Sequence, residues 1–156
     1  MAVFQLRESV LRVVPNVLET MLEIHPSPTG QGLPSGADRI SAIIGIGGDE
    51  VHGMIYVHFP RHLGEEVAGK LLDGCVGAEL GDGEVNDVVG EMCNMMAGGL
   101  KADLAEVGFE AGISPPSIIR GKGFTIDPEP GMEVSHFGFL CGKHVLDLEI
   151  HLRIES

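Results

Sequence analysis

The sequence predicts an α+β domain in which a mostly antiparallel sheet carries helices on one face. Residues 82–107 repeat apolar positions at the spacing of one long helix. Residues 39–59 and 134–154 each contain two alternating apolar and polar segments around a short turn, which predicts two antiparallel hairpins. Since no linker divides the chain, we expect a single domain over residues 1–156.

The N-terminal segment predicts a helix followed by a loop. Residues 3–22 carry apolar side chains at helical spacing, with Pro15 inside the pattern. Because proline lacks an amide hydrogen and clashes with the preceding turn, we expect a kink or two shorter helices. Residues 25–36 are rich in Pro, Gly and Ser, which predicts a loop.

The first hairpin is expected over residues 39–46 and 51–59, with turn residues at 47–50. The glycines near this turn lead into a strand and lack the spacing of a dinucleotide or P-loop motif, so a phosphate-binding loop is excluded. Pro60 is suited to the first turn of a second helix, which we expect to end at Gly74.

The long helix has two unlike faces. We expect Asp82 to cap its N-terminus and the helix to end before Gly108. Its apolar side comprises Val85, Val88, Val89, Met92, Met96 and Leu100, and its opposite side comprises Asp87, Glu91, Asn94 and Gly98. Glu91 and Asn94, three residues apart, project as neighbours. The two glycines at 98 and 99 each cost about 1 kcal/mol of helix stability. They indicate either a face reserved for function or close helix packing.

The C-terminal part predicts strands. Ser114–Pro116 ends the helical region, residues 117–124 form a short strand, and residues 127–131 form a loop. Residues 134–140 and 145–154 form the second hairpin across residues 141–144. In the last strand the apolar residues are expected to face the core, and Asp147, Glu149, His151 and Arg153 to face water.

Composition excludes several classes of protein. A formal net charge of −13 and a pI near 4.8 disfavour binding to nucleic acid and to anionic membranes. No apolar run is long enough to span a bilayer, and the first residues lack a signal-peptide pattern, so we expect a cytoplasmic protein. Three cysteines, at 75, 93 and 141, lie outside any Cys-x-x-Cys spacing, which is typical of structural thiols in a reducing compartment.

Motifs for metal binding or nucleophilic catalysis are missing from the sequence. The seven histidines include no His-Glu-x-x-His, although His52 and His58 share a strand face and His62 lies just beyond them. Scattered surface histidines and a metal site assembled in three dimensions are both open interpretations. No Gly-x-Ser-x-Gly motif occurs. The Glu91-x-x-Asn94 pair therefore remains the candidate site, although this spacing is common in helices.

In its setting, this pair resembles the active-site motif of the CheX branch of the CheC/CheX/FliY chemotaxis phosphatases. The resemblance covers nearly the whole chain. The segments that carry it are Asn16–Met21, Ile43–Tyr56, Asn86–Gly98 and Ser114–Phe124, which match the family's opening helix, first hairpin, active-site helix and following strand in order. One Glu-x-x-Asn motif per chain favours the CheX type, because many CheC proteins carry two.

The resemblance implies a hydrolase that removes phosphate from the phosphorylated aspartate of a CheY-like response regulator. Asn94 would orient the attacking water, and Glu91 would pair with the lysine of the receiver. Asp87 and Gly98 are candidate contacts to this partner. The chain needs no cofactor of its own, and Mg²⁺ is expected on the receiver. Family members of this type commonly form homodimers through sheet edges, which the C-terminal hairpin could provide.

Two other functions remain open. The chain could be a non-catalytic binding or adaptor module of the same fold, which would bind a receiver without speeding its loss of phosphate. Alternatively, it could be an unrelated metal-binding protein that uses His52 and His58. The predicted order of preference is phosphatase, adaptor and then metal-binding protein.

Overall fold

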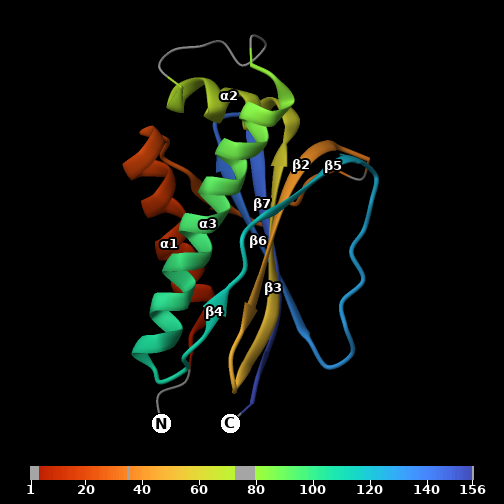
Figure 1. Cartoon of the computed structure of the whole chain (residues 1–156). Coiled ribbons are helices and arrows are strands. Elements are labelled where there is room, and N and C mark those ends of the chain that lie inside the picture. Colours follow the sequence, from red (N-terminus) through yellow and green to blue (C-terminus); the bar gives the residue numbers. More distant parts are fainter. Residues whose placement is uncertain (1–3, 35, 73–79, 156) are drawn as a thin grey trace.

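A computed structural model describes residues 4–34, 36–72 and 80–155. In these residues a seven-stranded antiparallel sheet carries three helices on one face, which confirms the predicted fold class (Figure 1). The elements in chain order are α1 (Leu6–Leu22), β1 (Ser27–Thr29), β2 (Asp38–Gly47), β3 (Val51–Pro60), α2 (Arg61–Leu71), α3 (Asp82–Glu106), β4 (Gly112–Ile113), β5 (Ser117–Lys122), β6 (Glu133–Cys141) and β7 (His144–Ile154).

The two predicted hairpins form the centre of the sheet. The strand order is β1-β6-β7-β3-β2, and the outer edge of β2 is shared by β4 and β5. The β2–β3 hairpin pairs Ile44 with Ile55, and the β6–β7 hairpin pairs Phe137 with Leu148. β3 and β7 then join the hairpins by pairing along residues 51–58 and 147–154. The register of the strands places their apolar residues on one common face.

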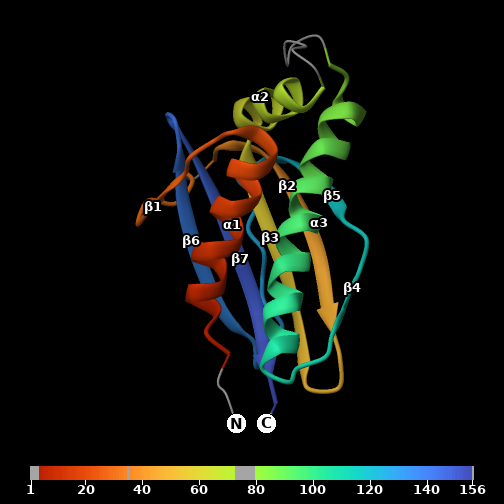
Figure 2. The same cartoon turned by 90° about the vertical axis from the view of Figure 1, so that its left-hand side faces the viewer.

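The hydrophobic core lies between this face and the helices. Figure 2 shows α1 and α3 side by side over the sheet, with α2 at one end. The apolar residues predicted on the inner side of α3 are all buried, namely Val85, Val88, Val89, Met92, Met96 and Leu100. They pack in one cluster with buried side chains of the sheet, including Ile40, Ile44 and Phe59. None of the described helices is long and apolar enough to cross a membrane.

α1 is a single helix that continues through Pro15. Of the two expected outcomes, two shorter helices is therefore wrong, and a kink at Pro15 stays a prediction. Val10 and Val14 before the proline, and Leu18 after it, are buried in the same core. Burial of one such side chain contributes about 1.5–3 kcal/mol. Together these contacts offset the cost of a proline inside a helix, which is about 3 kcal/mol.

The helix starts differ in detail from the prediction. Gly81 occupies the N-cap position of α3, and Asp82 is its first helical residue, with no side-chain cap. Pro60 occupies the N-cap position of α2 and not its first turn. The predicted end of this helix at Gly74 lies outside the described residues, as does Cys75. The long helix ends at Glu106, ahead of Gly108 with a φ of 94°, as predicted.

Two short strands were not predicted. β1 lies inside the expected loop and pairs with residues 138–140 of β6, and Pro28 is tolerated because β1 is an edge strand. β4 has two residues, which pair with Ile46 and Gly47. Neither segment is long enough to show an alternating pattern, so tertiary contact determines both.

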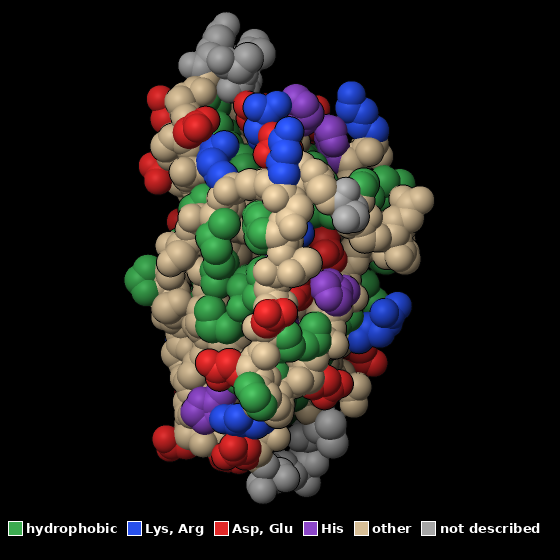
Figure 3. Space-filling view, turned by 90° about the vertical axis from the view of Figure 1, so that its right-hand side faces the viewer, with side chains coloured by type: hydrophobic (Ala, Val, Ile, Leu, Met, Phe, Trp, Pro, Cys, Tyr) green, Lys and Arg blue, Asp and Glu red, His purple; other side chains and the backbone are tan. Residues whose placement is uncertain are grey.

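The sheet face opposite the helices is not the wet surface that the alternation of β7 predicts. Asp147, Glu149 and His151 are 7%, 9% and 2% exposed, so this prediction is wrong for these three residues. Residues 32–34, 36–37 and 123–126 line a cavity together with Asp147 and Glu149, which shows that these loops lie over the face. Figure 3 shows this side of the molecule, where hydrophobic, acidic and histidine side chains are mixed.

Candidate functional site

α3 presents the predicted site residues on its solvent side. Asp87 and Glu91 are exposed and Asn94 is half-buried, whereas Met92 and Met96 on the inner side are fully buried. Because a helix has 3.6 residues per turn, the burial of the inner side fixes which residues face outward. The pairing of Glu91 and Asn94 on one outer face therefore follows from the packing of α3 on the sheet.

The side chains of Glu91 and Asn94 are available to a partner. Within the part of the chain that the structure describes, neither side chain makes a hydrogen bond or an ion pair. A carboxylate accepts hydrogen bonds, and a carboxamide both donates and accepts them. The pair thus offers one negative charge and one bifunctional polar group about one helical turn apart.

Gly98 and Gly99 of α3 have different environments. The difference shows which of the two glycines is explained by close helix packing. A Cβ at Gly98 would meet no atom within 4 Å, so Gly98 keeps an open patch beside Asn94. A Cβ at Gly99 would stand 2.6 Å from Cγ1 of Val13 in α1. Close helix packing therefore explains Gly99, and it does not explain Gly98.

Cys93, inside the motif, has a structural role as predicted. It is fully buried, and its Sγ donates a weak hydrogen bond to the backbone oxygen of Ala42 at 3.8 Å. Burial raises the pKa of the Cys93 thiol to about 12 and that of Cys141 to about 11. Since a thiolate is the reactive form of cysteine, neither group is suited to nucleophilic chemistry.

The N-terminal half of α3 carries a strip of exposed carboxylates. Its members are Asp82, Glu84, Asp87 and Glu91. Acidic groups in the first turn interact favourably with the positive end of the helix dipole. Beyond this local effect, the strip gives the candidate site a negative field, which favours a partner with a basic surface.

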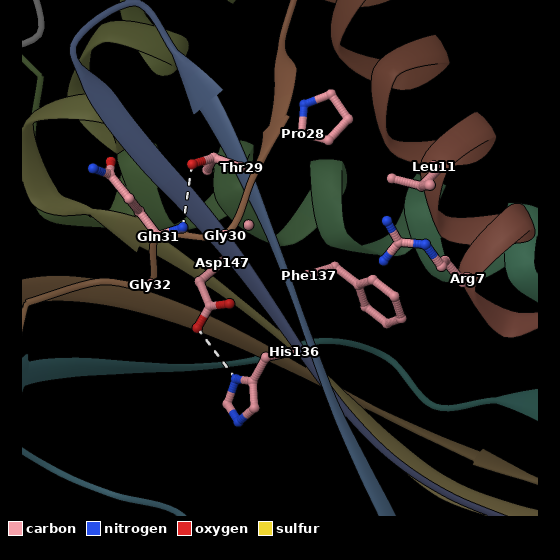
Figure 4. A pocket seen from close by; sticks show the side chains of 11 residues that line it. Arg7, Leu11, Pro28, Thr29, Gly30, Gln31, Gly32, His136, Phe137 and Asp147 are labelled. Atoms are coloured by element: carbon pink, nitrogen blue, oxygen red, sulfur yellow. Dashed lines mark hydrogen bonds and ion pairs between the residues drawn. The ribbon is translucent and has the colours of Figure 1, made fainter.

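Three cavities, of about 390, 440 and 620 Å³, lie away from α3. One, of about 390 Å³, is lined by residues 28–32 together with Arg7, His136 and Asp147. Figure 4 shows His136 and Asp147 pointing toward each other across its wall, with Nδ1 and Oδ2 3.5 Å apart. A neighbouring cavity of about 440 Å³ adjoins Asp147 and Glu149. None of these cavities is lined by a residue of α3.

A chain of buried polar groups lies under the loops on the far side of the sheet. His58 Nε2 lies 3.1 Å from Glu149 Oε1, and His58 Nδ1 lies 2.6 Å from Ser41 Oγ. His151 Nε2 lies 2.6 Å from the other carboxylate oxygen. The carboxylate accepts from both rings. Ser41 and His58 are fully buried, so this Ser-His-Glu arrangement has no access for a substrate and acts as a structural network.

The pKa values of Asp147 and Glu149 in this region are shifted in opposite directions. Burial alone would raise the pKa of Glu149, but hydrogen bonds from His58 and His151 and the charges of His58 and His136 outweigh burial and lower the pKa to about 2. Burial raises the pKa of Asp147, which His136 only partly offsets. Glu149 is therefore the stably charged centre of the network.

The geometry does not favour the metal-binding alternative. In residues 4–34, 36–72 and 80–155, no group of three or more His, Cys, Asp or Glu side chains could hold a metal ion. His58 contacts Ser41 and Glu149, and His62 Nδ1 lies 3.5 Å from Glu65 Oε1. Two of the three histidines that suggested a site, His58 and His62, thus have other partners.

Sequence reasoning missed the residues that hold α3 against β5. Arg120 donates a hydrogen bond from Nε to Asn86 Oδ1 at 2.7 Å. A Cβ at Gly90 would stand 3.3 Å from Cγ of Pro116. Asn86 and Gly90 both lie within the motif segment. Their partners Arg120 and Pro116 lie about thirty residues later in the chain, and no sequence pattern links positions so far apart.

The chain is similar to proteins of one family. The family model described as chemotaxis phosphatase CheX matches residues 40–140. No curated protein sequence matches the chain. Among solved structures, the chemotaxis protein CheX from Vibrio vulnificus is 30% identical, with a TM-score of 0.78, and the match covers 94% of this chain and 95% of that one.

Two further structures extend the similarity. A CheC-like superfamily protein from Shewanella sp. PV-4 is 28% identical, with a TM-score of 0.80, over 98% of this chain and 99% of that one. The CheX of a CheX-CheY-BeF3-Mg²⁺ complex from Borrelia burgdorferi is 24% identical, with a TM-score of 0.75, over 97% and 99%. This last likeness shows a shared fold.

Proposed function

Because the chain belongs to the CheX family of chemotaxis phosphatases, we propose that it accelerates loss of phosphate from the aspartyl phosphate of a CheY-like response regulator. The observation that carries this proposal is the pair of exposed Glu91 and half-buried Asn94 on the outer face of α3, whose side chains have no other described partner. Support also comes from the Borrelia protein of the same fold, which was crystallised with CheY, BeF3 and Mg²⁺.

Asn94 is the proposed group that orients the attacking water. Hydrolysis of an acyl phosphate requires a water in line with phosphorus and stabilisation of charge on the transferred group. The carboxamide of Asn94 can accept a hydrogen bond from this water and donate another to a phosphoryl oxygen. Mg²⁺ bound to the receiver would stabilise the charge on the phosphoryl group. A rigid helix holds such a group within the tolerance of catalysis.

Glu91 is the proposed anchor. Its exposed carboxylate would pair with the lysine of the receiver site and thereby fix the partner in register with Asn94. Asp87 lies one turn before Glu91 and Gly98 one turn after Asn94, so both flank the pair on the same face. The open space at Gly98 would admit the backbone of the receiver.

A homodimer through a sheet edge is part of the proposal. β1 pairs with β6 only at residues 138–140, so residues 133–137 of β6 have no outer strand among the described residues. An edge of this kind is a ready site for strand pairing with another copy. Light scattering after size exclusion tests this: a mass of twice 16.5 kDa is expected, and a monomer at every concentration would remove the dimer from the proposal.

The test of function is the rate of phosphate loss from phosphorylated CheY-type receivers. We expect acceleration by wild type, loss of about 100-fold in Asn94→Ala, and a weaker interaction with the receiver in Glu91→Ala. Glu106→Ala is the matched control, because Glu106 is an exposed carboxylate near the end of the same helix. Wild-type activity in Asn94→Ala would contradict the assignment of Asn94.

The alternative is a receiver-binding or adaptor module of the same fold. It would bind a receiver with measurable affinity, and neither wild type nor any variant would change the rate of phosphate loss. The acidic strip on α3 supports binding in either case, so only the rate distinguishes the two functions.

A further inference from the structure

The start of α3 is held by an arginine from β5. Arg120 donates from Nε to Asn86 Oδ1 at 2.7 Å and from Nη2 to the backbone oxygen of Asp82 at 3.3 Å, and its Nη1 lies 3.6 Å from Asp82 Oδ1. The helix has no side-chain cap of its own at this end. The planar guanidinium thus binds two successive turns of α3 at once, a geometry that the point charge of a lysine cannot reproduce.

A second contact lies one turn further along the same side. Gly90 is buried, and a Cβ there would stand 3.3 Å from Cγ of Pro116 and 3.7 Å from Cδ1 of Ile118. The backbone of α3 therefore approaches the start of β5 closely at this point. Together, Arg120 and Pro116 fix both the rotation and the axial position of α3 on the strand.

These contacts lie in one row with Asn94. Asn86, Gly90 and Asn94 are each four residues apart, so they follow one another along the same side of the helix. The first is bound by Arg120 of β5, the second packs against Pro116 and Ile118, and the third is the half-buried polar group of the candidate site. Asn94 therefore lies one turn beyond two successive turns of α3 that contact the segment of residues 116–120.

We infer that Arg120, acting through Asn86, is a positioning residue that sets the rotation of α3 and so aims the Asn94 carboxamide. This inference rests on the proposed role of Asn94 in the phosphatase reaction. A catalytic group must be held within about 0.5 Å and 10–20° of its productive geometry. Release of one anchor allows α3 to rotate by such an amount while its apolar side stays buried, because that side is broad.

The first experiment separates kcat from KM in receiver dephosphorylation. We expect kcat to fall about 10- to 100-fold in Arg120→Ala, with KM within about twofold of wild type. Asn86→Ala should behave in the same way, the double variant should be no worse than either single one, and Asn86→Asp should restore kcat because it keeps an acceptor for Arg120.

Arg12→Ala is the matched control. Arg12 and Ser9 of α1 bind Asp103 of α3, so this variant also removes an arginine that ties α3 to a neighbouring element, but nine residues beyond Asn94. It should keep the kcat of wild type. Wild-type kcat in a folded Arg120→Ala, or an equal loss of kcat in Arg12→Ala, would overturn the inference.

A second measurement keeps the inference testable if no receiver is dephosphorylated, an outcome that would count against the proposed function alone. The side-chain amide signals of Asn94 in NMR spectra, assigned by their loss in Asn94→Ala, should shift or broaden in Arg120→Ala and remain unchanged in Arg12→Ala. Unchanged Asn94 signals in Arg120→Ala would show that Arg120 does not orient this side chain.

Discussion

Gly99 of α3 lies so close to Val13 of α1 that a Cβ at position 99 would stand 2.6 Å from Cγ1 and 3.0 Å from Cγ2 of the valine. Val13 is buried and β-branched, so its side chain has little freedom to move aside. The neighbouring Gly98 has no such contact. The two adjacent glycines therefore provide a matched pair of positions.

We predict opposite effects of alanine at these positions on the free energy of unfolding. Gly98→Ala should stabilise the protein by up to about 1 kcal/mol, because alanine is the better helix former. Gly99→Ala should destabilise it by about 1–3 kcal/mol through overpacking against Val13. Urea denaturation measures both, and the double variant Val13→Ala/Gly99→Ala should recover part of the loss. Equal effects at 98 and 99 would contradict the packing role of Gly99.

The network around Glu149 predicts a specific dependence of stability on pH. The pKa of Glu149 is lowered to about 2 from a usual value of 4.5, so its contribution to stability is present above pH 4.5 and is lost as the pH falls from 4.5 toward 2. At pH 7, Glu149→Gln should lower the free energy of unfolding by about 3 kcal/mol, since both histidines lose a buried charged partner.

Denaturation of wild type and Glu149→Gln at several pH values tests this dependence. The difference between the two proteins should shrink as the pH falls below 4.5. Glu106→Gln, which removes an exposed carboxylate, should show little difference at any pH. A difference that grows as the pH falls would have the wrong sign for a lowered pKa.

Cys93 and Cys141 should resist thiol reagents in the folded protein. Burial raises their pKa values to about 12 and about 11, so at pH 8 almost no thiolate forms and the reagent has no access. Mass spectrometry after brief alkylation should find both residues unmodified in buffer and modified in denaturant. Labelling of Cys93 at the rate of a free thiol in buffer would show that α3 opens locally.

The acidic strip on α3 predicts that association with a receiver depends on salt. Under the proposed function, the association rate should fall about tenfold between 50 and 500 mM NaCl, since screening weakens attraction to a basic surface. Glu84→Gln should slow association at low salt by about two- to threefold. Glu106→Gln, at the other end of the helix, is the control. Association that is independent of salt would remove the electrostatic argument for a basic partner.

The sequence predicts the elements that its local patterns encode. The alternation of β2 and β3 and the helical spacing of α3 are strong signals because each pattern repeats over many residues. In the structure, the apolar residues that each pattern places on one face are buried. The helical spacing of the apolar residues of α3 predicts that Met92 and Met96 are buried and that Glu91 is exposed, as the structure shows. The helical spacing alone therefore suffices to place both candidate residues on one outer face.

Features that depend on distant segments could not be read in this way. The alternation of β7 predicts that Asp147 and Glu149 face outward from the helices, but only the fold shows that loop residues cover them. β1 is a strand because β6 offers an edge, and its own residues indicate a loop. Likewise, the bond from Arg120 to Asn86 joins residues 34 positions apart, for which the sequence gives no signal.

The spacing of Asn86, Gly90 and Asn94 has a consequence for changes in chain length. Each residue added to a helix turns everything after it by about 100°. A single insertion between Gly90 and Asn94 would leave the contacts of Arg120 with Asn86 and of Pro116 with Gly90 unchanged. It would rotate the Asn94 carboxamide out of its position on the helix face. Related chains can therefore diverge by substitution along α3, whereas insertions and deletions between positions 86 and 94 should be absent from every active relative. An exposed turn such as residues 142–143 is, in contrast, the kind of place where length changes are expected.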